Sequence, residues 1–180
     1  MRDSAGAYGG LVAWTTLSIL VWIQWSTDTI ALIGSFAASA VLLFDVPQSP
    51  LAQPRNVVGG HLASACVGVG VRKLYDTLVH RRCIHDEEVW VGLFGTAATA
   101  LAIVCMRLTG TTHPPGGGTA LVAVVGSATL RGTGIWFLLY PVLAGSTLMV
   151  VVAVMAHGLV RRKYPMYWWH PAVADDIICP

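Results

Sequence analysis

Residues 132–160 read GTGIWFLLYPVLAGSTLMVVVAVMAHGLV and contain no Asp, Glu, Lys or Arg. A helix needs about 20 apolar residues to cross a membrane core about 30 Å thick, and this stretch is long enough. Five further runs also lack charged residues, namely 4–27, 29–44, 56–71, 89–106 and 108–130. A soluble domain of 180 residues has too little polar surface to cover six such runs, so they predict an all-α polytopic membrane protein.

The composition agrees with a membrane environment. Hydrophobic residues make up 55% of the chain and charged residues 11%, whereas soluble domains average about a quarter charged. The first run shows neither the basic start nor the cleavage site of a signal peptide, so we expect a retained hydrophobic helix at 1–28. The remaining organisation is a single transmembrane domain over 1–180 that ends in a basic and aromatic tail at 161–180.

Two clusters of basic residues bear on the topology. The first holds Arg72, Lys73, Arg81 and Arg82, and the second is 161–163. Because the positive-inside rule places both on the cytoplasm-like face, one segment between them should fail to cross. The shortest is 117–130, which would span about 21 Å as a helix. We therefore expect four to six membrane helices, with the 72–88 loop and the C-terminal tail on one face.

Two proline-containing segments interrupt the apolar runs, around Pro54 and around Pro114 in THPPGGG, residues 112–118. The two prolines at 114–115 supply no amide hydrogens, so a new helix is expected to start only near Gly117. Irregular backbone at membrane depth is tolerated only inside protein or beside a wet cavity. The segment at Pro114 is therefore either a re-entrant loop that feeds a half-helix or a turn followed by a short crossing helix.

The two breaks also match in register. Residues 37–40 and 97–100 have similar small side chains at an offset of 60, and Pro54 maps onto Pro114 at the same offset. Transporters are often built from such repeats, with the substrate site at the paired helix breaks. The breaks are therefore the candidate binding region.

The first break contributes Arg55, Asn56 and His61 as candidate substrate-binding residues. The Arg55 guanidinium, together with the amides of the following helix, could face an anion, or it could anchor to a lipid phosphate. His61 could relay a proton or donate to an anion, and a hydrogen-bonded packing role is the alternative.

The second break contributes a continuous set of candidate substrate-binding residues. Consecutive glycines let backbone amides approach a bound group, and an anion can lie at the start of a half-helix. The His113 ring could donate from one nitrogen to a carbonyl freed by the break and face a cavity with the other. The set comprises His113, Pro114, Pro115, Gly116, Gly117, Gly118 and Thr119.

The residues give little support to catalysis or to a bound cofactor. All nine Asp and Glu residues lie outside or at the ends of the apolar runs, so none is placed inside for acid–base work. The four cysteines are widely spaced, and the chain has no metal-binding His-x-x-x-His pattern. We therefore expect no catalytic residues, no metal and no cofactor. The formal net charge of +2 indicates no nucleic-acid surface.

The string LTGTTHPPGGGTAL, residues 108–121, resembles the signature of the HPP family of integral membrane proteins. PQSPLAQPRN at 47–56, continuing to Gly60 and His61, is similar to the family's other characteristic block, and YPMYWW at 164–169 resembles its closing motif. The family often has Pro-Ala-Gly-Ala-Thr where this chain has Pro-Gly-Gly-Gly-Thr. Its members are generally described with four transmembrane helices, fewer than the six runs counted above.

The resemblance implies a function. Some members, in chloroplast envelopes and cyanobacteria, are associated with nitrite transport, and some bacterial members carry appended CBS domains for which this chain has no room. We therefore expect a membrane permease for a small inorganic anion, nitrite first, in contact with the lipid bilayer. A non-transporting membrane scaffold or assembly protein is the alternative. The sequence leaves open a homo-oligomer and the choice among a bacterial inner membrane, a plastid envelope or another organelle.

Overall fold

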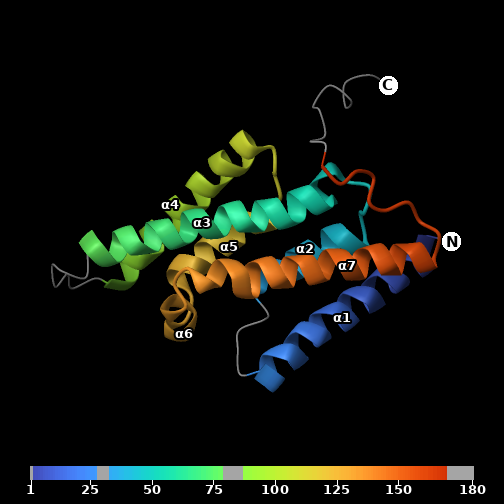
Figure 1. Ribbon diagram of the computed structural model, residues 1–180, viewed down its shortest axis with the longest axis horizontal. Coiled ribbons are helices and arrows are strands. Elements are labelled where there is room, and N and C mark those ends of the chain that lie inside the picture. The colour runs from blue at the N-terminus through green and yellow to red at the C-terminus, as the bar shows by residue number, and fades with distance from the viewer. Residues whose placement is uncertain (1, 28–32, 79–86, 170–180) are drawn as a thin grey trace.

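The computed structural model describes residues 2–27, 33–78 and 87–169, and within these ranges it is helical and contains no strand. Figure 1 shows the helices lying largely along one axis as a bundle. In chain order the elements are α1 (Arg2–Thr27), α2 (Gly34–Phe44), η1 (Pro50–Ala52), α3 (Pro54–Leu78), α4 (Glu87–Thr109), α5 (Pro114–Val125), α6 (Ala128–Gly132), η3 (Leu138–Leu143) and α7 (Ala144–Leu159).

The prediction of a polytopic membrane protein is confirmed. Among the described residues, three stretches are long and apolar enough to cross a membrane, namely Gly6–Thr27, Glu88–Thr109 and Leu138–Leu159. In each of the first two stretches only 22% of the residues in the most apolar window are buried. Most of their apolar side chains therefore face outward. A helix that is apolar all round and stands at the edge of a bundle is suited to lipid contact. The chain is therefore an integral membrane protein.

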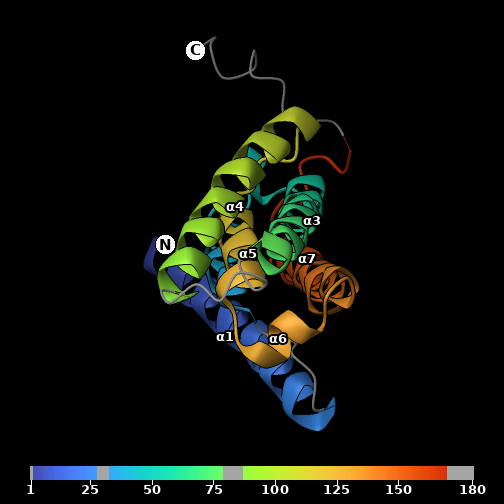
Figure 2. The same cartoon turned by 90° about the vertical axis from the view of Figure 1, so that its left-hand side faces the viewer.

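The two short helices, α2 and α5, lie in the centre of the packing. Figure 2 shows α5 between α3 and α4. Helix α5 runs parallel to α3, because Gly60 packs against His113 and Gly68 against Ala123. It runs antiparallel to α2, since Thr119 bonds to Ser35 whereas His113, at its start, bonds to Ser39 further along α2. Both short helices thus present their side chains to neighbours on several sides.

The prediction that the two basic clusters share one face is wrong. Arg72 donates to the Val124 carbonyl at the end of α5, with a distance of 3.3 Å. The tail that follows 161–163 packs at the opposite end, where Met166 N–H donates to Gln53 Oε1 just before α3 begins. Helices α4, α5 and α7 alternate in direction (Figure 1), so three passes separate the clusters. Positions 81 and 82 lie outside the described residues.

The physical reason is that α5 packs parallel to α3 and antiparallel to α4, so the chain changes direction at the break although α5 is short. Its 12 residues span about 18 Å as a helix, well short of a membrane core. The irregular segment 110–113 precedes it, and the five-residue α6 follows it. At the second break the structure has a turn followed by a short helix that is not among the stretches long enough to cross a membrane, so the choice between the re-entrant and the crossing alternative stays a prediction.

A second correction concerns where α5 starts. The helix begins at Pro114 rather than near Gly117, with both prolines in its first turn. Proline is compatible with that position, because the first amides of a helix have no intrahelical acceptor and the fixed φ of proline already suits a helix. The glycines at 116–118 are therefore helical residues and do not form a loop.

Candidate functional site

Five polar side chains form a buried network in the middle of the bundle. They come from three helices: α2 supplies Ser35 and Ser39, α3 supplies His61, and α5 with its N-cap supplies Thr119 and His113. Ser35 is 7% exposed and the other four are fully buried. Buried polar groups in a membrane protein must find partners inside the protein, so the contacts among these side chains define the site.

The hydrogen bonds join the five side chains in one line. Ser35 Oγ and Thr119 Oγ1 are 2.8 Å apart. Thr119 Oγ1 lies 2.7 Å from His61 Nδ1. Ser39 Oγ then lies 2.8 Å from the Nε2 atoms of both His61 and His113. The line ends where His113 Nδ1 meets the Leu51 carbonyl at 2.8 Å.

Close helix approach places the two imidazoles side by side. The ring centroids of His61 and His113 are 4.9 Å apart. Gly60 makes this possible, since a Cβ at that position would lie 2.6 Å from His113 Cβ. Gly116 acts in the same way on α5, where a Cβ would lie 2.9 Å from both the Gly60 carbonyl oxygen and Ser64 Oγ. Small residues at such positions are what close packing in lipid requires.

The backbone before α5 is held by its own capping bonds and by α3. Helix α4 ends in a Schellman motif, with Gly110 in the left-handed region at φ 61°. Its two bonds run from Thr111 N to Met106 O at 2.9 Å and from Gly110 N to Arg107 O at 3.3 Å. Asn56 Nδ2 donates to the Thr112 carbonyl at 2.9 Å. These contacts fix the path that carries His113 into the bundle.

The loop between α2 and α3 is organised by a buried glutamine. Gln53 Nε2 donates to the carbonyls of Pro47 at 2.9 Å and Ser49 at 2.8 Å. Tyr164 in the tail donates to the Ala52 carbonyl at 2.9 Å, and burial raises the pKa of the Tyr164 hydroxyl, which therefore stays protonated. This loop presents Leu51 O to His113.

Arg55 lies apart from the network, at the end of the bundle. Its guanidinium donates to Trp169 O at 2.7 Å and to Thr109 O at 2.9 Å, so it joins the start of α3 to the end of α4 and to the tail. A cation at a helix C-terminus is favourable, and here Arg55 supplies one to α4. Neither sequence-based reading of Arg55, anion ligand or lipid anchor, included this bridging role.

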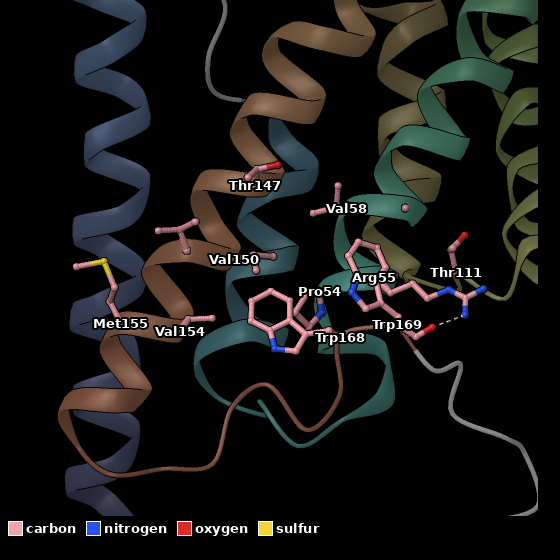
Figure 3. Close-up of a pocket in the computed structure, with 12 residues that line it drawn as sticks. Pro54, Arg55, Val58, Thr111, Thr147, Val150, Val154, Met155, Trp168 and Trp169 are labelled. Carbon is pink, nitrogen blue, oxygen red and sulfur yellow. Dashed lines mark hydrogen bonds between the residues drawn. The ribbon is translucent and has the colours of Figure 1, made fainter.

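A groove of about 500 Å³ opens beside Arg55 (Figure 3). Figure 3 shows Val150, Val154 and Met155 along one wall, with Trp168 across the groove. The other lining residues are Pro54, Val58, Gly59, Thr111, Thr147, Val151 and Trp169. Apart from Arg55 and two threonines the lining is apolar, so the groove suits hydrocarbon and not a small anion.

The structure brings together only part of the predicted site. His61, His113 and Thr119 meet in the network, whereas Arg55 and Asn56 hold the backbone around it. The prolines at 114 and 115 start α5, and the glycines mainly allow helices to approach. His113 donates to a carbonyl as expected, but the carbonyl belongs to Leu51, and the second nitrogen faces Ser39 and not a cavity.

Ser35 and Ser39 are the residues that sequence reasoning missed. Their spacing of four places both on one face of an apolar helix, and this was a usable signal. Ser64 was missed as well: its hydroxyl is fully buried and has no hydrogen-bond partner. Among the described ranges no group of three or more His, Cys, Asp or Glu could hold a metal ion. The chemistry available at the network is therefore that of imidazoles and hydroxyls.

Comparison with known proteins gives one family and two relatives. The model of the HPP transmembrane region matches residues 3–165. A transmembrane protein of Dictyostelium discoideum is 48% identical over 143 residues, which cover 79% of this chain and 43% of the relative. A second from the same organism is 45% identical over 139 residues, 77% of this chain and 45% of the relative. The chain thus spans less than half the length of these curated relatives. No solved structure matches.

Proposed function

We propose that this chain, which belongs to the HPP transmembrane family, is a permease for a small inorganic anion, with nitrite the first candidate. The observation that carries the proposal is the buried network of imidazoles and hydroxyls at the break before α5. These groups can donate hydrogen bonds to an anion, and none of them carries a fixed negative charge. Nitrite itself comes from the family resemblance.

Ser64 adds an unused donor to this region. Its hydroxyl lies one helical turn from His61 and against Gly116, and it is buried without a partner. An unpaired hydroxyl in an apolar interior is unfavourable, so a bound acceptor would relieve the cost. We place the anion between Ser64 and the His61–His113 pair, with the described conformation as the closed state.

Positive charge at one end of the bundle favours the approach of an anion. Arg55, Arg107 and the cluster at 161–163 all lie at this end, and Asp45 is the acidic residue there whose side chain is described. Charged surfaces of one sign raise the local concentration of the opposite ion. The proposal includes no chemical change in the anion, only its passage.

Uptake by proteoliposomes tests the proposal. Purified chain in liposomes should give saturable uptake of nitrite, measured against nitrate, formate and protein-free vesicles. Ser64→Ala should raise the KM for nitrite several-fold, by the loss of about 1 kcal/mol of hydrogen bonding. The matched control is Ser146→Ala, since Ser146 is also buried but bonds to the Val142 carbonyl, four residues earlier in the chain, at 2.7 Å. Absence of saturable flux for all three anions would overturn the proposal.

Arg55 provides a second variant pair. Arg55→Lys should keep part of the flux and Arg55→Ala should lose most of it, because lysine retains the charge but cannot bond two carbonyls with one planar group. Lys73→Ala, an exposed position at the other end of α3, is the charge control. If no anion moves but the protein is stable in a larger complex, the scaffold alternative takes the place of the permease.

A further inference from the structure

The hydrogen bonds of the buried network have a direction that can be worked out atom by atom. The Leu51 carbonyl can only accept, so His113 Nδ1 must carry the hydrogen in that bond. In a neutral imidazole the other nitrogen is then an acceptor. His113 Nε2 therefore accepts from the Ser39 hydroxyl, its partner at 2.8 Å.

The single hydrogen of Ser39 settles the rest of the line. Ser39 Oγ has contacts with both Nε2 atoms and with the Ser35 carbonyl at 3.2 Å. Because its hydrogen goes to His113, His61 Nε2 must donate to Ser39, and neutral His61 must accept at Nδ1 from Thr119. Thr119 then accepts from Ser35. With both histidines neutral, one arrangement satisfies every contact along the line from Ser35 to Leu51, and all its donors point toward Leu51. The longer contact of Ser39 Oγ with the Ser35 carbonyl, at 3.2 Å, then has no hydrogen.

We propose that the coupling ion of this permease is a proton, which moves along the line from Ser35 through Thr119, His61 and Ser39 to His113. The proposal rests on the permease function above. It assigns to the His61–His113 pair the role of a site that holds one proton while the anion is bound.

The transfer balances at each step. A proton that binds Ser35 Oγ releases the Ser35 hydroxyl hydrogen to Thr119, and Thr119 passes its own to His61 Nδ1. His61 then gives its Nε2 hydrogen to Ser39, and Ser39 gives its hydrogen to His113 Nε2. His113 becomes an imidazolium that donates to Ser39 and Leu51. Return of the proton by the same steps in reverse, from His113 Nε2 back to Ser35 Oγ, releases it at Ser35 and restores the starting tautomers and hydroxyl orientations.

One proton on the histidine pair supplies the positive charge that offsets the negative charge of a buried anion. An isolated ion in a medium of low dielectric is strongly unfavourable, and an ion pair is much less so. Two protons on the pair are disfavoured because the rings are 4.9 Å apart and like charges repel. The expected stoichiometry is therefore one proton for each nitrite.

The charged groups on the surrounding helices lie away from the His61–His113 pair. Asp45 after α2 and Arg107 on α4 are exposed, and Arg55 on α3 bonds to Thr109 and Trp169. His157 on α7 bonds to the Leu43 carbonyl at 2.8 Å. Helix α5 carries no charged residue. Within the described part of the chain, each histidine of the pair is thus the nearest titratable group to the other.

The first test is independent of transport. Imidazole ¹⁵N spectra of the full chain in lipid bilayers, assigned with His61→Gln and His113→Gln, should show the Nδ1–H form for neutral His113 and the Nε2–H form for neutral His61. Ser39→Ala should shift the Nε2 resonances of both rings, and Ser146→Ala neither. An Nε2–H form of neutral His113, or Nε2 resonances that do not shift in Ser39→Ala, would overturn the relay whatever the flux.

The second test measures coupling. A nitrite gradient across vesicles that contain a pH-sensitive dye should move one proton per nitrite, after subtraction of nitrous acid leakage in protein-free vesicles. Ser39→Ala should lower the coupled flux at least about tenfold, and Ser39→Thr should restore part of it. Saturable nitrite flux without proton movement would overturn the coupling and leave the permease standing. No saturable flux would overturn the permease and the coupling with it, even where the ¹⁵N spectra confirm the hydrogen-bond order.

Discussion

Gly60→Ala should destabilise the bundle, because Gly60 is where α3 approaches the segment before α5 most closely. A Cβ there would lie 2.6 Å from His113 Cβ and 2.7 Å from the Thr111 carbonyl oxygen. Carbon atoms pack at about 3.5 Å or more, so the two segments must separate by about 1 Å. That displacement is comparable with the tolerance of a hydrogen bond and should loosen the bond between His113 and Ser39.

The magnitude follows from two opposing effects. Overpacking a close contact costs about 1–3 kcal/mol, whereas alanine gains about 1 kcal/mol over glycine in a helix. Gly70→Ala is the matched control, since Gly70 lies on the same helix with nothing within 4 Å of the added Cβ. The control should gain about 1 kcal/mol, so the two variants should differ by about 1–3 kcal/mol in unfolding free energy.

Reversible unfolding in mixed detergent micelles, followed by circular dichroism, measures the difference. The ¹⁵N resonance of His113 should shift in Gly60→Ala and not in Gly70→Ala. Equal stability of the two variants, with an unshifted His113 ring, would show that the contact between Gly60 and His113 is not close in the membrane, and the positioning argument for the network would fail.

Three further predictions concern the supports of the site and the topology. The double variant Pro114→Ala, Pro115→Ala should lose no more than about 2 kcal/mol, because α4 is already ended by its own Schellman motif. A larger loss with increased helicity would mean that the prolines end α4. Gln53→Ala should lower the unfolding free energy by about 2–3 kcal/mol, since one buried and one partly buried carbonyl lose their donor, and a loss below about 0.5 kcal/mol would show that water replaces it. In a cysteine-free background, Lys73→Cys and Lys163→Cys should react with an impermeant maleimide from opposite sides of the membrane, and labelling from one side would restore the shared-face topology.

The membrane character of the chain followed from the sequence because it depends on composition alone. Runs such as 132–160 are too apolar and too long for water, whatever they pack against. The proline-bearing breaks were also readable, since proline removes a backbone donor in any context. His113 and Thr119 could be chosen as candidates because they are polar residues next to such a break.

The partners of these residues depended on the tertiary structure. Ser39 becomes the centre of the network only because Gly60 and Gly116 let three helices approach, and this distance is not encoded in any local pattern. The path of α5 across the bundle likewise depends on packing, which outweighed the charge rule that predicted a shared face for the basic clusters. Composition and backbone chemistry act locally and can be read from the chain, whereas the meeting of Ser35, Ser39, His61, His113 and Thr119 is a long-range event that only the folded bundle decides.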